Sequence, residues 1–155
     1  MGVSGCGKTT IAGLLSKKIN IPFFDADDFH PEQNVEKMTN GVALDDADRK
    51  PWLKTLNINL KEWQKKKGAI LACSALKEKY RASLTVGVNI QWVFLEGNLK
   101  LIKKRLEHRK GHFMNTHLLQ SQFECLEAPK YGTKIGIDKS PEYIVDELLR
   151  HIDNE

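Results

Sequence analysis

The chain begins with a glycine-rich segment of the kind that binds phosphate. Residues 2–9 fit the pattern G-x-x-x-x-G-K-[ST] at every position. Glycine adopts positive φ angles easily, so such a loop can turn its backbone N–H groups inward around a polyphosphate, and the next helix points its positive end at the same place. Lys8 would bring a positive charge to the β- and γ-phosphates, and the Thr9 hydroxyl would be a ligand for Mg²⁺.

We call this segment the P-loop and predict that it binds a nucleotide. A chance glycine-rich turn before an ordinary helix is the alternative, which the complete match and the amphipathic run after it disfavour. The candidate nucleotide-binding residues are Gly2, Val3, Ser4, Gly5, Cys6, Gly7, Lys8 and Thr9.

Two aspartates form the second candidate group. Asp25 and Asp27 come directly after the short apolar stretch 21–24, which we predict to end a strand. Ligands of parallel sheets bind at the carboxyl ends of the strands, so this pair should face the same crevice as the P-loop. One carboxylate would hold Mg²⁺ through water, and the other would orient or deprotonate an acceptor hydroxyl. A solvated acidic turn is the alternative, which the neighbouring P-loop disfavours.

Four arginines, Arg49, Arg81, Arg105 and Arg109, lie in or near predicted loops or helix ends on the phosphate side. A guanidinium group binds two oxygens at once, which suits a carboxylate or a transferring phosphoryl group. The glycine two residues after Arg109 should break a helix, so we expect a mobile lid over about residues 103–117. The lysines of this stretch fit an ordinary solvated helix face.

Alternating helices and strands must position these groups. Apolar residues at helical spacing predict helices directly after the P-loop, near residues 31–39, from about Pro51 to Gly68, and over 101–106, 118–126 and 144–152. Continuous apolar runs predict buried strands at 21–24, 69–73, 90–95 and 134–138. We therefore predict a three-layer α/β fold, with a parallel sheet and helices on both faces.

The start of the chain departs from the usual arrangement of a P-loop. A P-loop normally follows a buried strand, and here only Met1 precedes it. We expect the first strand to be largely missing, and the sheet to be weakened as a result.

Composition bounds the remaining possibilities. The chain has 155 residues with 41% hydrophobic and 28% charged residues, as expected of one globular domain spanning residues 1–155. The net charge of +4 is not gathered into a tail and suits an anionic small ligand as well as nucleic acid, so it does not decide between them. We expect a small-molecule substrate and no nucleic-acid partner. Three scattered cysteines, no signal peptide and no apolar run of membrane-spanning length favour a cytoplasmic protein with reduced thiols and no membrane partner.

From residue 1 to about 129, the sequence resembles the gluconate kinase (gluconokinase) family. The motifs that carry the resemblance are residues 1–5, 25–31 with Asn34 and 36–38, Gly41 with 44–53, 73–77 with Tyr80 and Arg81, 109–114 and 119–127. The resemblance implies ATP-dependent phosphorylation of D-gluconate at its 6-hydroxyl, a shikimate-kinase-like P-loop kinase fold with a small helical lid, and a homodimer. Members of the family carry several apolar residues before the P-loop, which this chain lacks.

The resemblance also implies roles for individual residues. Thr10 joins the ATP-binding residues, and Asp25 becomes the metal ligand beside Thr9. Asp27 becomes the substrate-side carboxylate and general base. The remaining roles are gluconate binding by Arg49, Ser74, Lys77 and Arg81, and lid closure on the phosphates by Arg105 and Arg109. His30 and His112 lie in matched motifs, and the sequence assigns them no role.

Two alternatives stay open at this stage. Another small-molecule kinase of the same fold would act on shikimate or a nucleotide, which the motifs at 45–53 and 73–77 disfavour. A catalytically impaired nucleotide-binding protein is the other, suggested by the missing strand. A GTPase is disfavoured because neither Asn-Lys-x-Asp nor Asp-x-x-Gly occurs.

Overall fold

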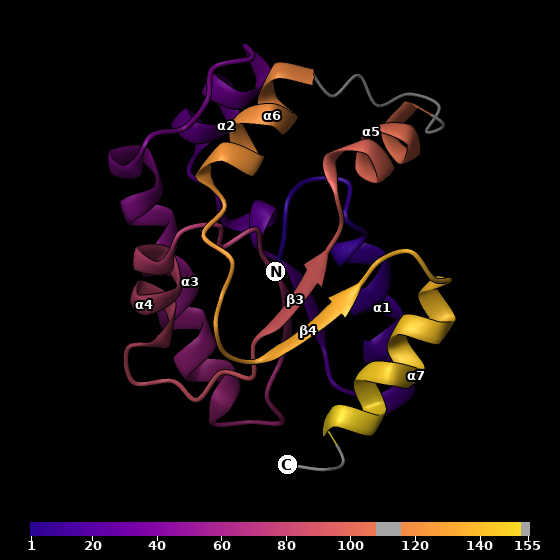
Figure 1. The fold of residues 1–155 in the computed structure, drawn as a ribbon. Helices are drawn as coiled ribbons and strands as arrows, with labels where there is room; N and C mark the ends of the chain where they lie inside the picture. Colours follow the sequence, from indigo (N-terminus) through magenta and orange to yellow (C-terminus); the bar gives the residue numbers. More distant parts are fainter. Residues whose placement is uncertain (108–115, 153–155) are drawn as a thin grey trace.

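A computed structural model describes residues 1–107 and 116–152 of the chain (Figure 1). Seven α-helices alternate with short parallel strands over these residues, which confirms the predicted α/β class. In chain order the elements are α1 (Lys8–Ile19), β1 (Phe23–Asp25), the 3₁₀ helix η1 (Ala26–Phe29), α2 (Glu32–Thr39), α3 (Asp46–Gln64), β2 (Ile70–Ala72), α4 (Glu78–Thr85), β3 (Val93–Glu96), α5 (Leu99–Glu107), α6 (Thr116–Cys125), β4 (Thr133–Gly136) and α7 (Pro141–Ile152).

The strands form two parallel pairs, whereas the sequence predicts one continuous sheet. β1 pairs with β2, with Phe23 opposite Ile70, and β3 pairs with β4, with Val93 opposite Thr133. The prediction of a single sheet is therefore corrected for the described part of the chain. The break falls between β2 and β3, beside the start of the chain.

Met1 and Gly2 link the two pairs. The Met1 ammonium group donates to the carbonyl oxygen of Val93 at 2.5 Å, and the N–H of Leu95 donates to the Met1 carbonyl at 3.0 Å. On the other side, the N–H of Gly2 donates to the carbonyl of Ser74 at 3.2 Å. The start of the chain thus lies between β3 and the segment after β2, and it is too short to pair along either strand.

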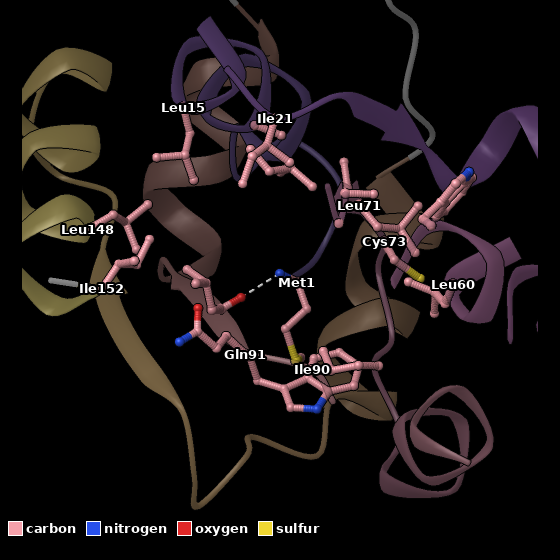
Figure 2. Close-up of a pocket in the computed structure, with 18 of the residues that line it drawn as sticks. Met1, Leu15, Ile21, Leu60, Leu71, Cys73, Ile90, Gln91, Leu148 and Ile152 are labelled. Atoms are coloured by element: carbon pink, nitrogen blue, oxygen red, sulfur yellow. Dashed lines mark hydrogen bonds between the residues drawn. The ribbon is translucent and has the colours of Figure 1, made fainter. Parts of the chain in front are cut away.

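A cavity of about 620 Å³ lies between β2 and β3, and Met1 is one of the residues that line it (Figure 2). Its lining is largely apolar and comes from the strands and from the helices on both sides. The labelled lining residues include Met1, Leu15, Ile21, Leu60, Leu71, Ile90, Leu148 and Ile152.

Helices cover the strands on two sides and bury two apolar clusters. α1 and α7 pack together on one side, and α3 and α4 on the other (Figure 1). The first cluster includes Ile11, Leu15, Ile135, Val145 and Leu148. The second includes Trp52, Leu56, Tyr80, Leu84 and Phe94. None of the described helices is long and apolar enough to cross a membrane.

Helix α3 begins five residues before the proline that the sequence suggested as its head. The Asp45 carboxylate accepts from the N–H of Asp48 at 2.8 Å, and the Asp48 carboxylate accepts from the N–H of Asp45 at 3.1 Å. This reciprocal capping box satisfies two free backbone donors and starts the helix at Asp46. Pro51 consequently lies inside the helix.

Candidate active site

The P-loop has the backbone that its glycines allow. Gly2, Gly5 and Gly7 have φ angles of 146°, 79° and 96°, and α1 begins directly afterwards at Lys8. A Cβ atom on Gly2 would lie 2.8 Å from both the Cys6 sulfur and a backbone oxygen. The loop therefore requires glycine at this position for space as well as for conformation.

The side chain of Lys8 folds back over the P-loop. Its Nζ donates to the carbonyl oxygens of Gly2 and Val3, each at 2.9 Å. These contacts hold the positive charge at the loop, beside the N-terminus of α1. The positive helix end and the ammonium group together favour an anion at this position.

Thr9 and Asp25 join the P-loop to the end of β1. The Thr9 hydroxyl donates to Asp25 Oδ2 at 2.8 Å, and Asp25 Oδ1 accepts from the N–H of Asp27 at 3.1 Å, which caps η1. The structure thus brings Asp25 into contact with the P-loop, with Asp27 beside it. A hydroxyl and a carboxylate side by side are the hard oxygen donors that Mg²⁺ prefers, so these residues fit that ion.

Asp27 lies at the start of η1, and 82% of its side chain is exposed. Desolvation raises the pKa of Asp27, the negative charges of Asp25 and Asp28 raise it further, and the positive charges of Lys8 and Arg49 oppose the shift. The carboxylate is therefore open to a ligand and within electrostatic reach of both the P-loop lysine and α3.

Basic side chains gather around Tyr80, where α3 faces α4. The Arg49 guanidinium carbon lies 5.6 Å from the Tyr80 ring centroid, and Lys77 Nζ lies 5.7 Å from it. The Asp46 carboxylate accepts hydrogen bonds from Lys77, Lys79 and the Tyr80 hydroxyl, and burial together with the Asp46 contact raises the pKa of Tyr80 to about 12. Arg49 and Lys77 thus both lie beside the Tyr80 ring, with Lys77 also bonded to Asp46.

Arg81, in contrast, is committed to protein partners. Its side chain is 1% exposed and pairs with Glu78 at 2.7 Å. The guanidinium group also donates to the carbonyl oxygens of Ala75, Leu76 and Glu127. This geometry favours a structural role, so we leave Arg81 out of the substrate-binding set proposed below. Sequence alone could not separate it from the other arginines, because its partner carbonyls come from distant segments.

Of the two predicted lid arginines, Arg105 lies within the described residues and Arg109 does not. Arg105, on α5, donates to the carbonyl of Ile137 just after β4. Arg109 lies outside the described residues, as do His112 and most of the predicted lid. Ser74 is half-buried, and its carbonyl accepts the Gly2 hydrogen bond described above.

Gln122 on α6 is a contact of the P-loop that the sequence analysis did not single out. Its Oε1 accepts from the Ser4 N–H at 2.7 Å, and its Nε2 donates to the Ser4 hydroxyl at 3.1 Å. The available signal was its position in the 119–127 motif, which gave no role for the residue. The contact fastens the P-loop to the helix that follows the predicted lid.

Known proteins resemble the chain over nearly its whole length. The sequence model of the shikimate kinase family matches residues 4–152. The probable gluconokinase of Xenopus tropicalis is 41% identical, over 100% of this chain and 92% of that protein. The thermoresistant gluconokinase of Escherichia coli is also 41% identical, over 94% of this chain and 81% of that protein. The crystal structure of a gluconokinase from Sinorhizobium meliloti superimposes with a TM-score of 0.89 at 35% identity, covering 99% of this chain and 91% of that one.

Proposed function

Since the chain belongs to the gluconokinase family of shikimate-kinase-like P-loop kinases, we propose that it transfers the γ-phosphoryl group of ATP to the 6-hydroxyl of D-gluconate. The products are 6-phospho-D-gluconate and ADP. One observation of the structure supports the proposal: the Thr9 hydroxyl donates to the Asp25 carboxylate, so the P-loop and the aspartate pair that holds the candidate base are adjacent.

The nucleotide side consists of the P-loop and Thr10. Backbone N–H groups of the loop and the Lys8 ammonium group bind the phosphates. Thr9 and Asp25 would hold Mg²⁺, which neutralises charge on the β- and γ-phosphates when bound. Arg105 closes on the phosphates, which excludes water that would otherwise compete with the sugar hydroxyl.

The acceptor side consists of Asp27, Arg49, Ser74 and Lys77. Arg49 binds the gluconate carboxylate through its two-pronged guanidinium group, with Lys77 and Ser74 completing the pocket. Asp27 orients the 6-hydroxyl and accepts its proton. A strong base is unnecessary because phosphoryl transfer is loose and the proton leaves late, so alignment and charge stabilisation supply most of the catalysis.

A coupled assay tests this function directly. The purified chain is incubated with ATP, Mg²⁺ and D-gluconate, and 6-phosphogluconate formation is followed, with Lys8→Ala as the matched inactive control. Shikimate, nucleoside monophosphates and a neutral sugar of similar size serve as competing acceptors. Turnover of one of these in preference to gluconate would overturn the substrate assignment.

We also propose that the chain is a cytoplasmic homodimer. Ile58 on α3 and Val86 after α4 are apolar side chains that remain 54% and 61% exposed, and the Asn57 side chain bonds to the Val86 carbonyl at 3.0 Å, which keeps the two segments together. Light scattering after size exclusion measures the mass in solution. A monomer at micromolar concentration would contradict the proposal.

A further inference from the structure

His30 directly follows η1, and its imidazole ring is fixed by packing. The side chain is 3% exposed, and its ring stacks on the Trp52 indole with centroids 4.4 Å apart and an angle of 14° between the planes. Trp52 is itself buried, and its Nε1 donates to the carbonyl of Ala26 at 2.8 Å. The ring plane of His30 is thus set by a partner that is itself held in place.

Asn34 determines which ring nitrogen of His30 carries the proton. Its Nδ2 donates to the carbonyl of Asp48 at 2.8 Å, and because a carbonyl only accepts, the amide nitrogen must point this way. The same Nδ2 lies 3.3 Å from His30 Nδ1. An amide nitrogen only donates, so Nδ1 accepts, and a neutral imidazole must then carry its proton on Nε2.

The Nε2 atom faces the proposed general base. It lies 3.8 Å from Asp27 Oδ1. Burial and the nearby positive charge of Arg49 lower the pKa of His30 to about 4, so the ring is neutral near pH 7 and Nε2–H is a neutral donor. Contacts of catalytic groups are often long in unliganded enzymes and shorten in the complex, and the exposed Asp27 side chain has room to turn.

We propose that His30 is a positioning residue, whose Nε2–H holds the Asp27 carboxylate in the orientation that receives the acceptor hydroxyl. One oxygen of Asp27 faces the imidazole, which leaves the other for the substrate. A neutral donor orients the carboxylate without cancelling its charge, as a lysine or arginine would. The inference rests on the proposed function and adds a residue to the same site.

Two substitutions at position 30 separate orientation from packing. His30→Phe keeps an aromatic ring against Trp52 but removes the donor. His30→Gln places an amide nitrogen near the position of Nε2 and keeps a donor. We expect His30→Phe to lower kcat by about 10- to 100-fold, as expected for a hydrogen bond to a charged group, with the KM values for ATP and gluconate changed less than about 3-fold. His30→Gln should recover most of this loss.

The double variant with Asp27→Asn tests whether His30 acts through Asp27. In the Asp27→Asn background, His30→Phe should lower kcat less than about 2-fold further, because either change alone already removes the contact between His30 and the Asp27 carboxylate. Equal losses in both backgrounds, equal activity of the Phe and Gln variants, or a change in KM alone would overturn the proposal. Thermal midpoints of all variants identify any loss caused by unfolding.

Nitrogen-15 NMR tests the contact between His30 and Asp27 independently of any activity assay. Nitrogen-15 spectra of the imidazole should show the Nε2–H tautomer for His30, and the Nε2 resonance should shift in Asp27→Asn. An Nδ1–H tautomer, or no response to Asp27→Asn, would overturn the proposal. If the wild-type chain does not phosphorylate gluconate, the coupled assay refutes the proposed function. The nitrogen-15 spectra still show whether His30 contacts Asp27.

Discussion

A short β-forming extension before Met1 should stabilise the chain markedly. Met1 forms two hydrogen bonds with β3, to Val93 and Leu95, so residues added before it would extend along the cavity between β2 and β3. The extension would also replace the buried Met1 ammonium group, whose pKa burial lowers to about 6, with a neutral amide. An extension of five residues in strand conformation would span about 16 Å.

The expected gain follows from the cavity and its lining. About four apolar side chains would be buried, each contributing about 1.5–3 kcal/mol. Ordering five residues costs about 1–2 kcal/mol each, which offsets most of that gain. New backbone hydrogen bonds, at roughly 1 kcal/mol each, leave a net stabilisation of a few kcal/mol. For a domain of this size, that corresponds to a rise in Tm of about 5–15 °C.

The measurement compares three chains by calorimetry and by gluconate-dependent ATP turnover. They are the 155-residue chain, the chain with five alternating valines and isoleucines before Met1, and a control with five alternating glycines and serines. Only the apolar extension should raise Tm, and turnover should rise with it because the strand supports the P-loop. If all three match in both measurements, the cavity does not accept a strand and the inferred strand order is wrong.

Four further predictions concern single residues. Lys8→Ala should abolish turnover with an unchanged circular dichroism spectrum, because Lys8 contacts loop carbonyls and not the core; near-normal activity would refute the P-loop assignment. Asp27→Asn should lower kcat at least ~10²-fold while ATP still binds, whereas lost ATP affinity with normal kcat would make it a metal-side residue. Arg49→Lys should raise the KM for gluconate about 10-fold, and an equal loss for a neutral sugar would contradict carboxylate binding. The unfolded state protonates His30 near pH 6.5 and the folded state only near 4, so acidification through this window should lower the unfolding free energy of the wild type by about 3 kcal/mol more than that of His30→Gln. Equal losses in urea unfolding would refute the burial argument.

Local sequence was sufficient for the P-loop and for most helices. The glycines at 2, 5 and 7 adopt the positive φ angles that their type allows, and the apolar stripe after them forms α1. The capping box that starts α3 is also local: the residue types at 45 and 48 form it, and Pro51 lies inside the helix. Helix α4 was not among the predicted helices; its buried side chains are Tyr80, Arg81 and Leu84, so only a short apolar stripe marked it.

Tertiary structure alone decided which of the chemically similar residues reach the crevice. Arg49 and Arg81 look alike in the sequence, yet Arg81 is buried by carbonyls that include Glu127, 46 residues away, while Arg49 stays beside Tyr80. Gln122 contacts Ser4 across 118 residues, and His30 gains its role only where Trp52 and Asn34 fix its ring. Turn conformation and helical spacing depend on residues within a few positions of one another, so the sequence contains them. Burial and hydrogen-bond partnership depend on which distant segments pack together, and only the folded chain determines that.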